Sequence, residues 1–229
     1  DRFLELCRTG EGIKDKYDFI ADVANKGDEG RIYLLEGYLY PDTYEIYVGS
    51  SEETVIGKML DRMNVIYGAG YTSRAEELNM SMDQVVTLAS IIEKEGKHDT
   101  FDKVSAVFHN RLDQKMALGS DVTVQYALGV KRLVLTQSEL GVDSPYNTYT
   151  HTGLPVGAIC SPGDAAIEAA LYPDSDYVDE GYLYFTLTDP ETGELAFSKT
   201  LEEHNALVEQ YRPLWQAYDQ KIQQAAANP

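Results

Sequence analysis

Apolar residues recur at helical spacing along much of the chain, most clearly after Ser81. Residues 81–84 (SMDQ) fit a capping box, in which the first and fourth side chains satisfy free backbone N–H groups where a helix begins, and Gly96 provides a helix stop. The apolar positions between them are Val85, Val86, Leu88, Ala89 and Ile92. We expect other helices over residues 11–29, 51–67 and 100–113, from Ser161-Pro162 to about Leu171, and from a second capping box at Thr200–Glu203 through a long stretch that Pro213 interrupts.

Two further stretches have the composition of strands and turns. Residues 31–47 are rich in tyrosine, leucine and isoleucine, with Gly37 and Pro41-Asp42 as breakers, so we expect short strands joined by a structured loop. We also expect a β-hairpin whose strand, turn and returning strand are residues 182–187, 189–193 and 195–198. Helices and hairpins without a regular strand–helix–strand alternation favour an α+β fold.

Composition narrows the class of partner. The 229 residues are 43% apolar, enough for a substantial core in one large domain or in a domain with a smaller lobe. The formal charge of −19 argues against nucleic acid or an anionic membrane surface as a partner, because both would repel the chain. The 17 tyrosines suit sugars, since the ring stacks on a sugar face and the hydroxyl bonds to sugar hydroxyls, although most tyrosines are expected in the core or at its edge.

Several kinds of site are disfavoured by spacing. Cys7 and Cys160 are isolated, so they form neither a disulfide framework nor a zinc site, and a single bridge between them is left open. The histidines do not occur in HExxH or HxH spacing, and the chain has no GxSxG motif and no phosphate-binding glycine loop, so we expect no metal and no cofactor. No apolar run approaches the roughly 20 residues that span a bilayer.

The helix after Ser81 carries an acidic candidate for catalysis. Glu93 falls on the flank of the apolar stripe, and Glu95 falls on the opposite flank. Partial desolvation raises the pKa of a carboxyl group, as a general acid near neutral pH requires. Charged residues near a helix end are commonly solvated, so the helix by itself leaves the role of Glu93 open. Glu95 either tunes Glu93 by like-charge repulsion or is solvated, and the pattern favours the second.

Short motifs follow one another through residues 31–208. They are LEGYLYPDTY at residues 35–44, ASIIEKE at 89–95, VFHNRL at 107–112, MALGSDVTV at 116–124, SPYNTY at 144–149, GLP at 153–155, PG at 162–163, YLYF at 182–185 and a final stretch from Phe197 to Asn205. In this order they resemble the motifs of the YceG-like (MltG) family of endolytic murein transglycosylases. The chain departs from the family pattern at Gly119, Val122, Val156 and Ser161, where the family has Gln, Pro, Pro and Asn. These departures put the detailed substrate preference in doubt, not the acid/base residue.

The resemblance implies an enzyme that cleaves the MurNAc–GlcNAc β-1,4 bond of peptidoglycan without water and leaves a 1,6-anhydro-MurNAc end. The first glutamate of ASIIEKE, Glu93 here, corresponds to the family's catalytic residue. Residues that the resemblance places near the substrate are Tyr40, Tyr146, Asn147 and Tyr149 as cleft-lining side chains, Glu36 as a bonding partner of sugar or backbone, and Asp121 as an orienting group. A purely structural role is an equal alternative for Glu36 and Asp121. Asn110 and Arg111 are expected to tie their helix to neighbouring loops.

The resemblance also sets expectations for the longer protein. It implies a YceG-like catalytic domain over residues 31–229, with residues 1–30 as a helical connector to a LysM-like lobe, and a membrane anchor outside this chain that holds the domain on the outer side of the cell membrane. The partners would be peptidoglycan glycan strands and, by family likeness, cell-wall synthesis proteins. Two alternatives stay open, a two-carboxylate glycoside hydrolase and a non-catalytic peptidoglycan-binding scaffold.

Overall fold

The structure is a computed structural model, and it describes residues 2–25, 30–68 and 70–227. The chain divides into two compact units, each built from two stretches of sequence. Unit 1 comprises residues 1–93 and 154–171, and unit 2 comprises residues 94–153 and 172–229. Helices with a single antiparallel hairpin among the described residues confirm the expected α+β class.

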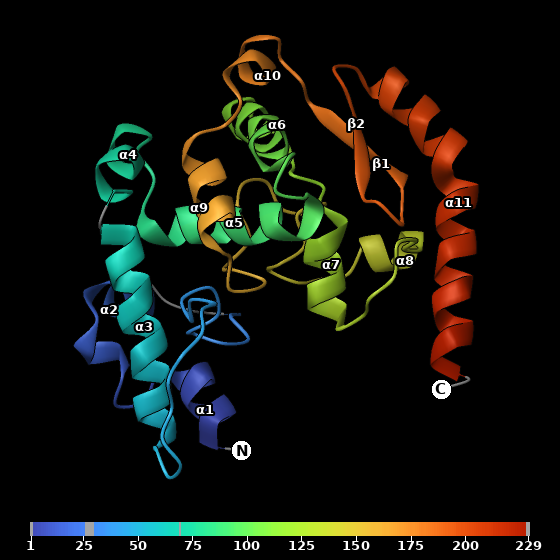
Figure 1. The fold of residues 1–229 in the computed structure, drawn as a ribbon. Coiled ribbons are helices and arrows are strands. Elements are labelled where there is room, and N and C mark those ends of the chain that lie inside the picture. The colour runs from blue at the N-terminus through green and yellow to red at the C-terminus, as the bar shows by residue number, and fades with distance from the viewer. Residues whose placement is uncertain (1, 26–29, 69, 228–229) are drawn as a thin grey trace. The chain divides into compact units, whose positions relative to one another are not determined.

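Unit 1 is helical (Figure 1). Its elements are α1 (Arg2–Thr9), the 3₁₀ turn η1 (Lys14–Lys16), α2 (Asp18–Asn25), α3 (Glu52–Gly68), α4 (Thr72–Glu77), α9 (Asp164–Leu171) and all but the last two residues of α5 (Met82–Glu95). The expected helix over residues 51–67 is confirmed as α3. Part of the expected helix over residues 11–29 is present as η1 and α2, while residues 26–29 lie outside the described part of the chain.

Helix α5 is buried on all sides between Val85 and Ile92. The predicted capping box is confirmed, because Gln84 N–H donates to Ser81 Oγ at 3.2 Å and Ser81 N–H donates to Gln84 Oε1 at 2.9 Å. The eight consecutive residues from Val85 to Ile92 are each at most 2% exposed. The expected single apolar stripe is therefore wrong, since a helix buried all round has no solvent face. Sequence spacing missed this because Thr87 and Ser90 are polar residues inside the core.

Residues 31–47 contain no strand, so the prediction of short strands there is wrong. The segment is bonded instead to the end of α1, where the N–H groups of Leu34 and Leu35 donate to the carbonyl groups of Arg8 and Cys7 at 3.1 and 3.0 Å. Both leucines are buried, which accounts for the apolar composition that suggested strands.

Ser90 fixes the segment that precedes α9 onto α5. Its hydroxyl donates to the Thr87 carbonyl at 2.7 Å and accepts the Ile159 N–H at 3.0 Å. Cys160 Sγ lies 3.4 Å from the Ser90 carbonyl oxygen. Helix α9 begins at Asp164, so the expected first helical residue, Pro162 after an N-cap at Ser161, is two residues too early. The segment 159–163 has no regular secondary structure before the helix begins.

Unit 2 combines helices with the hairpin (Figure 1). Its elements are α6 (Phe101–Asp113), α7 (Asp121–Leu128), α8 (Gln137–Leu140), α10 (Ser175–Asp179), β1 (Tyr184–Asp189), β2 (Glu194–Ser198) and α11 (Leu201–Ala227). The predicted helix over residues 100–113 and the predicted hairpin are confirmed, and Phe185 pairs with Phe197 in the antiparallel register. Phe185 also packs edge-on against Phe108 of α6, with ring centroids 5.7 Å apart.

Helix α11 continues through Pro213, so the predicted interruption is wrong. Contacts on both sides of Pro213 hold the helix. Before it, His204 bonds to Thr186 at 3.0 Å, and after it the Trp215 indole N–H donates to the Leu187 carbonyl at 2.9 Å. A proline removes one intrahelical hydrogen bond, and tertiary contacts of this kind offset that loss.

Three expectations about sites can be compared with the described residues. Cys7 and Cys160 are both free thiols, so they form no bridge. No group of three or more His, Cys, Asp or Glu side chains suited to a metal ion occurs in the described part of the chain. Within those same residues, no helix is long and apolar enough to cross a bilayer.

Gly37 is the position where we expect a methyl group to be most damaging. An added Cβ would lie 2.6 Å from Ala158 Cβ and 2.7 Å from Val86 Cγ1, and the φ angle of +94° disfavours any L side chain. Gly37→Ala should therefore lower the free energy of unfolding by about 2–4 kcal/mol in chemical denaturation. Gly57→Ala is the matched control, because Gly57 is inside α3 and its added Cβ meets only Tyr17 Oη at 3.7 Å. The control should gain about 0.5–1 kcal/mol, and equal losses in the two variants would contradict this account.

Ser90→Ala tests the bond between α5 and the segment before α9. The substitution leaves the buried N–H of Ile159 without its acceptor, so we expect a loss of about 1–3 kcal/mol in the free energy of unfolding. Ser105→Ala is the comparison, since the buried Ser105 hydroxyl has no partner among the described residues. It should leave the free energy of unfolding unchanged or raise it, and a larger loss there than at Ser90 would refute the assignment.

Candidate active site

Glu93 lies in the last turn of α5 and is partly buried, as expected. Its Oε2 accepts the backbone N–H of Gly163 at 3.2 Å. Gly163 directly precedes α9, so the backbone donor lies at the start of that helix. The added Cβ of a residue at position 163 would lie 3.8 Å from the same oxygen. The carboxyl group is therefore held in a defined orientation at the surface of unit 1 with part of its area accessible.

The other expected residues of unit 1 are in the 31–47 segment. Tyr40 is 7% exposed, and the guanidinium carbon of Arg62 lies 5.8 Å from the centre of its ring. Burial and the nearby charge of Asp164 raise the pKa of Tyr40. Glu36 is partly buried near Cys7, whose pKa is raised to about 11 by burial and by the charge of Glu36.

In unit 2, Asp121 and Tyr149 form one hydrogen-bonded pair. The Tyr149 hydroxyl donates to Asp121 Oδ1 at 2.5 Å, and Asp121 is the first residue of α7. Burial raises the pKa of both side chains, and for Tyr149 the adjacent carboxylate adds to the effect. Tyr149 is still 40% exposed, so it presents aromatic surface to solvent while its hydroxyl is fixed.

Tyr146 and Asn147 are buried beneath this pair, with exposed fractions of 1% and 0%. The Asn147 side-chain amide donates to the carbonyl groups of Leu140 and Val142 at 2.9 and 2.8 Å, and its oxygen accepts the N–H of Tyr149 at 2.9 Å. These contacts of Asn147 hold the loop that carries Tyr149.

The expected roles of Asn110 and Arg111 are confirmed. The Asn110 amide donates to the carbonyl groups of Tyr177 and Tyr182 at 3.2 and 2.9 Å. The Arg111 guanidinium donates to the carbonyl groups of Leu183 and Leu118 at 2.6 and 2.5 Å, so both side chains tie α6 to neighbouring segments of unit 2.

Glu95 is the residue that sequence analysis assigned incorrectly. It is partly buried and its Oε1 accepts the Ser120 hydroxyl at 2.5 Å, so the expectation of a solvated side chain is wrong. Burial, followed by the charge of Asp121, raises the pKa of Glu95 to about 7. No signal in the local sequence pattern indicates this, because the partner of Glu95, Ser120, is 25 residues further along the chain.

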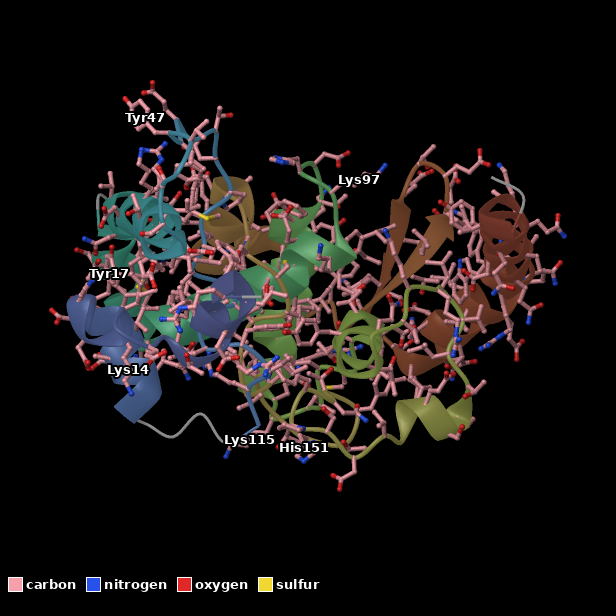
Figure 2. The ribbon with its side chains drawn as sticks, turned by 90° about the horizontal axis from the view of Figure 1, so that it is seen from below. Lys14, Tyr17, Tyr47, Lys97, Lys115 and His151 are labelled. Atoms are coloured by element: carbon pink, nitrogen blue, oxygen red, sulfur yellow. The ribbon has the colours of Figure 1, made fainter. Side chains whose placement is uncertain are left out.

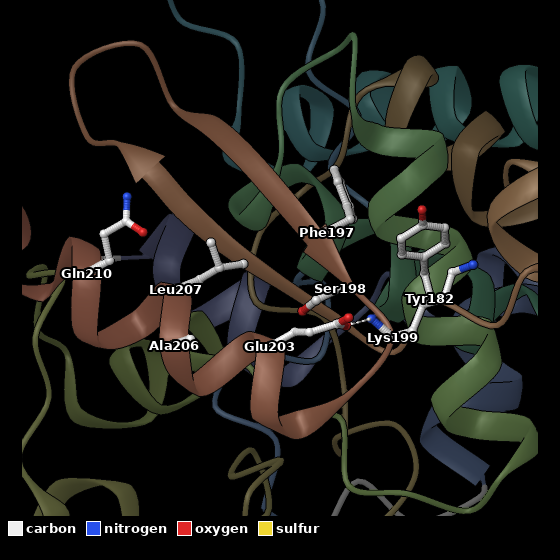
Figure 3. Close-up of a pocket in the computed structure, with 8 residues that line it drawn as sticks. All are labelled: Tyr182, Phe197, Ser198, Lys199, Glu203, Ala206, Leu207 and Gln210. Carbon is white, nitrogen blue, oxygen red and sulfur yellow. Dashed lines mark hydrogen bonds between the residues drawn. The ribbon is translucent and has the colours of Figure 1, made fainter.

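Two surface hollows are lined by other residues. One, of about 600 Å³, lies between the end of β2 and the start of α11 in unit 2 (Figure 3). Its polar groups already serve the fold, since Glu203 Oε2 accepts the backbone N–H groups of Lys199 and Thr200, and the Lys199 ammonium pairs with Glu180. The other, of about 400 Å³, lies in unit 1 beside Asp42 and Arg62. Tyr47 follows the lining residues Asp42–Glu45 in the sequence, and its side chain is 69% exposed and points away from its loop (Figure 2). None of the expected site residues lines either hollow.

Comparison with known proteins gives consistent results. The sequence profile described as the YceG-like family matches residues 6–210. The chain is 41% identical over 193 residues to a Bacillus subtilis protein named endolytic murein transglycosylase, covering 83% of this chain and 51% of that protein. It is 32% identical over 202 residues to the protein of the same name from Streptococcus pneumoniae serotype 2, covering 86% of this chain and 36% of that protein. The chain thus spans about half, or less, of these relatives.

A solved structure agrees with the sequence matches. The crystal structure of a putative YceG-like protein from Listeria monocytogenes superposes with a TM-score of 0.73 at 40% identity, covering 85% of this chain and 65% of that one. The matched profile covers most of the chain, and the fold matches that of a YceG-like protein. The chain therefore belongs to the YceG-like family.

Proposed function

We propose that this chain is the catalytic part of an endolytic murein transglycosylase and that Glu93 is its general acid and base. The observation that carries the proposal is the 41% identity to a protein of that name, together with a partly buried carboxyl group at Glu93 whose orientation the Gly163 N–H fixes. A general acid needs a fixed direction and limited access to water, and Glu93 has both.

The proposed reaction cleaves the MurNAc–GlcNAc β-1,4 bond without water. The protonated carboxyl group of Glu93 gives its proton to the glycosidic oxygen as the bond to C1 of MurNAc breaks and positive charge develops on the ring. The resulting carboxylate then takes the proton from the C6 hydroxyl of the same sugar, and that oxygen bonds to C1. The products are a GlcNAc end and a 1,6-anhydro-MurNAc end, with the proton returned to Glu93. Because the nucleophile belongs to the sugar itself, no second carboxylate is needed to activate water.

Substrate contacts are proposed separately for the two units. In unit 1 we assign them to Glu36 and Tyr40, and in unit 2 to Asp121 and Tyr149. The exposed ring of Tyr149 suits stacking on a sugar, and its hydroxyl is already fixed by Asp121. Tyr146 and Asn147 were expected to line the substrate cleft. Because both are buried, we assign them to the loop that presents Tyr149.

The same proposal covers the setting of the longer protein. Residues 1–30 would connect to a LysM-like lobe and residues 31–229 would form the catalytic domain, held at the outer side of the cell membrane by an anchor outside this chain. Peptidoglycan glycan strands would be the substrate, and cell-wall synthesis proteins the partners. This proposal is supported by the lengths of the matched relatives, since the chain covers 51% and 36% of them.

Glu93→Gln should lower the rate of glycan cleavage by about 10²–10⁴-fold, because an amide neither gives nor takes the proton. The thermal transition should change little, since the amide oxygen still accepts the Gly163 N–H. Cleavage is measured by mass spectrometry of defined glycan strands, in which an anhydro end is lighter by one water than a hydrolysed end.

Glu76→Gln is the matched control, an exposed glutamate of unit 1 that should keep wild-type activity. Full turnover by Glu93→Gln would reject the assignment of the acid/base. Hydrolysed ends from the wild type would favour a two-carboxylate hydrolase with Asp121 or Glu36 as the second group. If no new ends form, the chain is better described as a peptidoglycan-binding scaffold.

A further inference from the structure

A second carboxyl group at the end of α5 has no role in the proposed reaction. This inference rests on the proposed function. We propose that Glu95 is a positioning residue for the reaction, and that its carboxyl group holds Asp121 and Tyr149 in the arrangement that binds the glycan.

The geometry at the start of α7 links the three residues. Ser120 is the N-cap residue of α7, yet its hydroxyl does not cap that helix and donates instead to Glu95 Oε1 at 2.5 Å. The Val122 backbone N–H also bonds to the Glu95 carboxyl group. The Glu95 carboxyl group thus serves as the acceptor that an N-cap side chain would normally provide for α7. In the sequence, Asp121 lies between Ser120 and Val122, the two residues that donate to Glu95. The position of Asp121, and through it the Tyr149 hydroxyl at 2.5 Å, depends on the Glu95 carboxyl group.

The charged groups around Glu95 come from several elements. Asp121 from α7, Arg111 from α6 and Tyr149 from the loop after Asn147 act on this cluster, and Arg212 from α11 acts on Asp121. The Arg111 guanidinium directs its N–H groups to the carbonyl groups of Leu118 and Leu183. The guanidinium carbon of Arg111 also lies 5.0 Å from the centre of the Tyr184 ring of β1. The His204 ring of α11 stacks against that tyrosine. The cation next to Glu95 is therefore already engaged by the fold.

The surroundings raise the pKa of both acids, and burial is the main cause for each. The Tyr149 hydroxyl and Arg212 oppose the effect at Asp121, and the Ser120 hydroxyl opposes it at Glu95. The charge of Asp121 adds to the effect of burial at Glu95, whose pKa is raised to about 7. When Glu95 ionises at higher pH, two carboxylates lie in one desolvated cluster and repel each other, which weakens the support of Asp121 and Tyr149.

Glu95→Gln is the central test, because glutamine keeps one oxygen that can accept from the Ser120 hydroxyl but never ionises. For a pKa of about 7, the neutral fraction of Glu95 in the wild type falls from roughly nine-tenths at pH 6 to roughly one-tenth at pH 8. The ratio of the Glu95→Gln rate to the wild-type rate for anhydro-end formation should therefore rise about tenfold between pH 6 and pH 8.

Glu95→Ala, which removes the acceptor, should be slower than Glu95→Gln at both pH values. Glu202→Gln, at an exposed glutamate of α11, is the control whose ratio should stay constant.

Thermal unfolding without substrate checks that the variant folds and tests how ionisation of Glu95 changes the stability of the protein. A carboxyl group with a pKa of about 7 when folded and 4.5 when unfolded adds stability that is fully present below pH 4.5 and is lost as the pH rises through 7. Glu95→Gln lacks this dependence. The quantity to compare is the midpoint of thermal unfolding of Glu95→Gln minus that of the wild type. This difference should be roughly 5–10 °C larger at pH 8 than at pH 5.

The ring signal of Tyr149 separates the outcomes. In protein with ¹³C-labelled tyrosine, assigned with Tyr149→Phe, this signal should shift with a midpoint near pH 7 in the wild type and lose that step in Glu95→Gln. If the step is absent from the wild type, or is the same in Glu95→Gln, the proposal is overturned. A step in Tyr149 without the tenfold change in the rate ratio also overturns it, because Glu95 then has no part in the reaction. The wild type could instead form no anhydro ends at any pH while the Tyr149 ring signal still shows its step near pH 7. The proposed function would then have failed, and with it the role of Glu95 in the reaction. The effect of Glu95 ionisation on Tyr149 would still stand.

Discussion

The burial of α5 on every side is the constraint on which the rest of this structure depends. From Val85 to Ile92 the helix has no solvent face, so polar side chains within it must find partners inside the protein. Ser90 does so by bonding to the Ile159 N–H, which brings the segment before α9 alongside the helix. That segment then supplies the Gly163 N–H to Glu93. One buried helix thus determines where the backbone donor for the candidate catalytic carboxyl group lies.

The end of α5 brings two carboxyl groups into different surroundings. Glu93 meets a backbone N–H ahead of α9 in unit 1, while Glu95 meets the Ser120 hydroxyl ahead of α7 in unit 2. A reaction that uses the sugar's own hydroxyl as nucleophile needs one proton-transferring carboxyl group, not two. The surroundings of Glu95 fit the different task of supporting neighbouring side chains, because its oxygen atoms are already bonded to donors around the start of α7.

Several motifs of this chain lie in irregular backbone that buried contacts fix. The segments around Gly37 and Gly163 and the loop that carries Tyr149 have no regular secondary structure, yet each is fixed by buried contacts. Gly37 admits the close approach of Val86 and Ala158, and Asn147 uses both ends of its amide to shape the loop before Tyr149. At Gly37 the close approach leaves no room for a side chain.

The sequence by itself determined the longer helices, the hairpin, the capping box at Ser81 and the family, because these follow from local spacing and from motifs whose order survives in one chain. It also singled out Glu93 and the linking roles of Asn110 and Arg111. Tertiary structure alone decided that residues 31–47 bond to the end of α1 and not to a strand, that α11 continues through Pro213, and that Glu95 is desolvated beside Ser120. In each of these the deciding partner is distant in sequence, and the free energy of burial or bonding to such a partner outweighs local propensity.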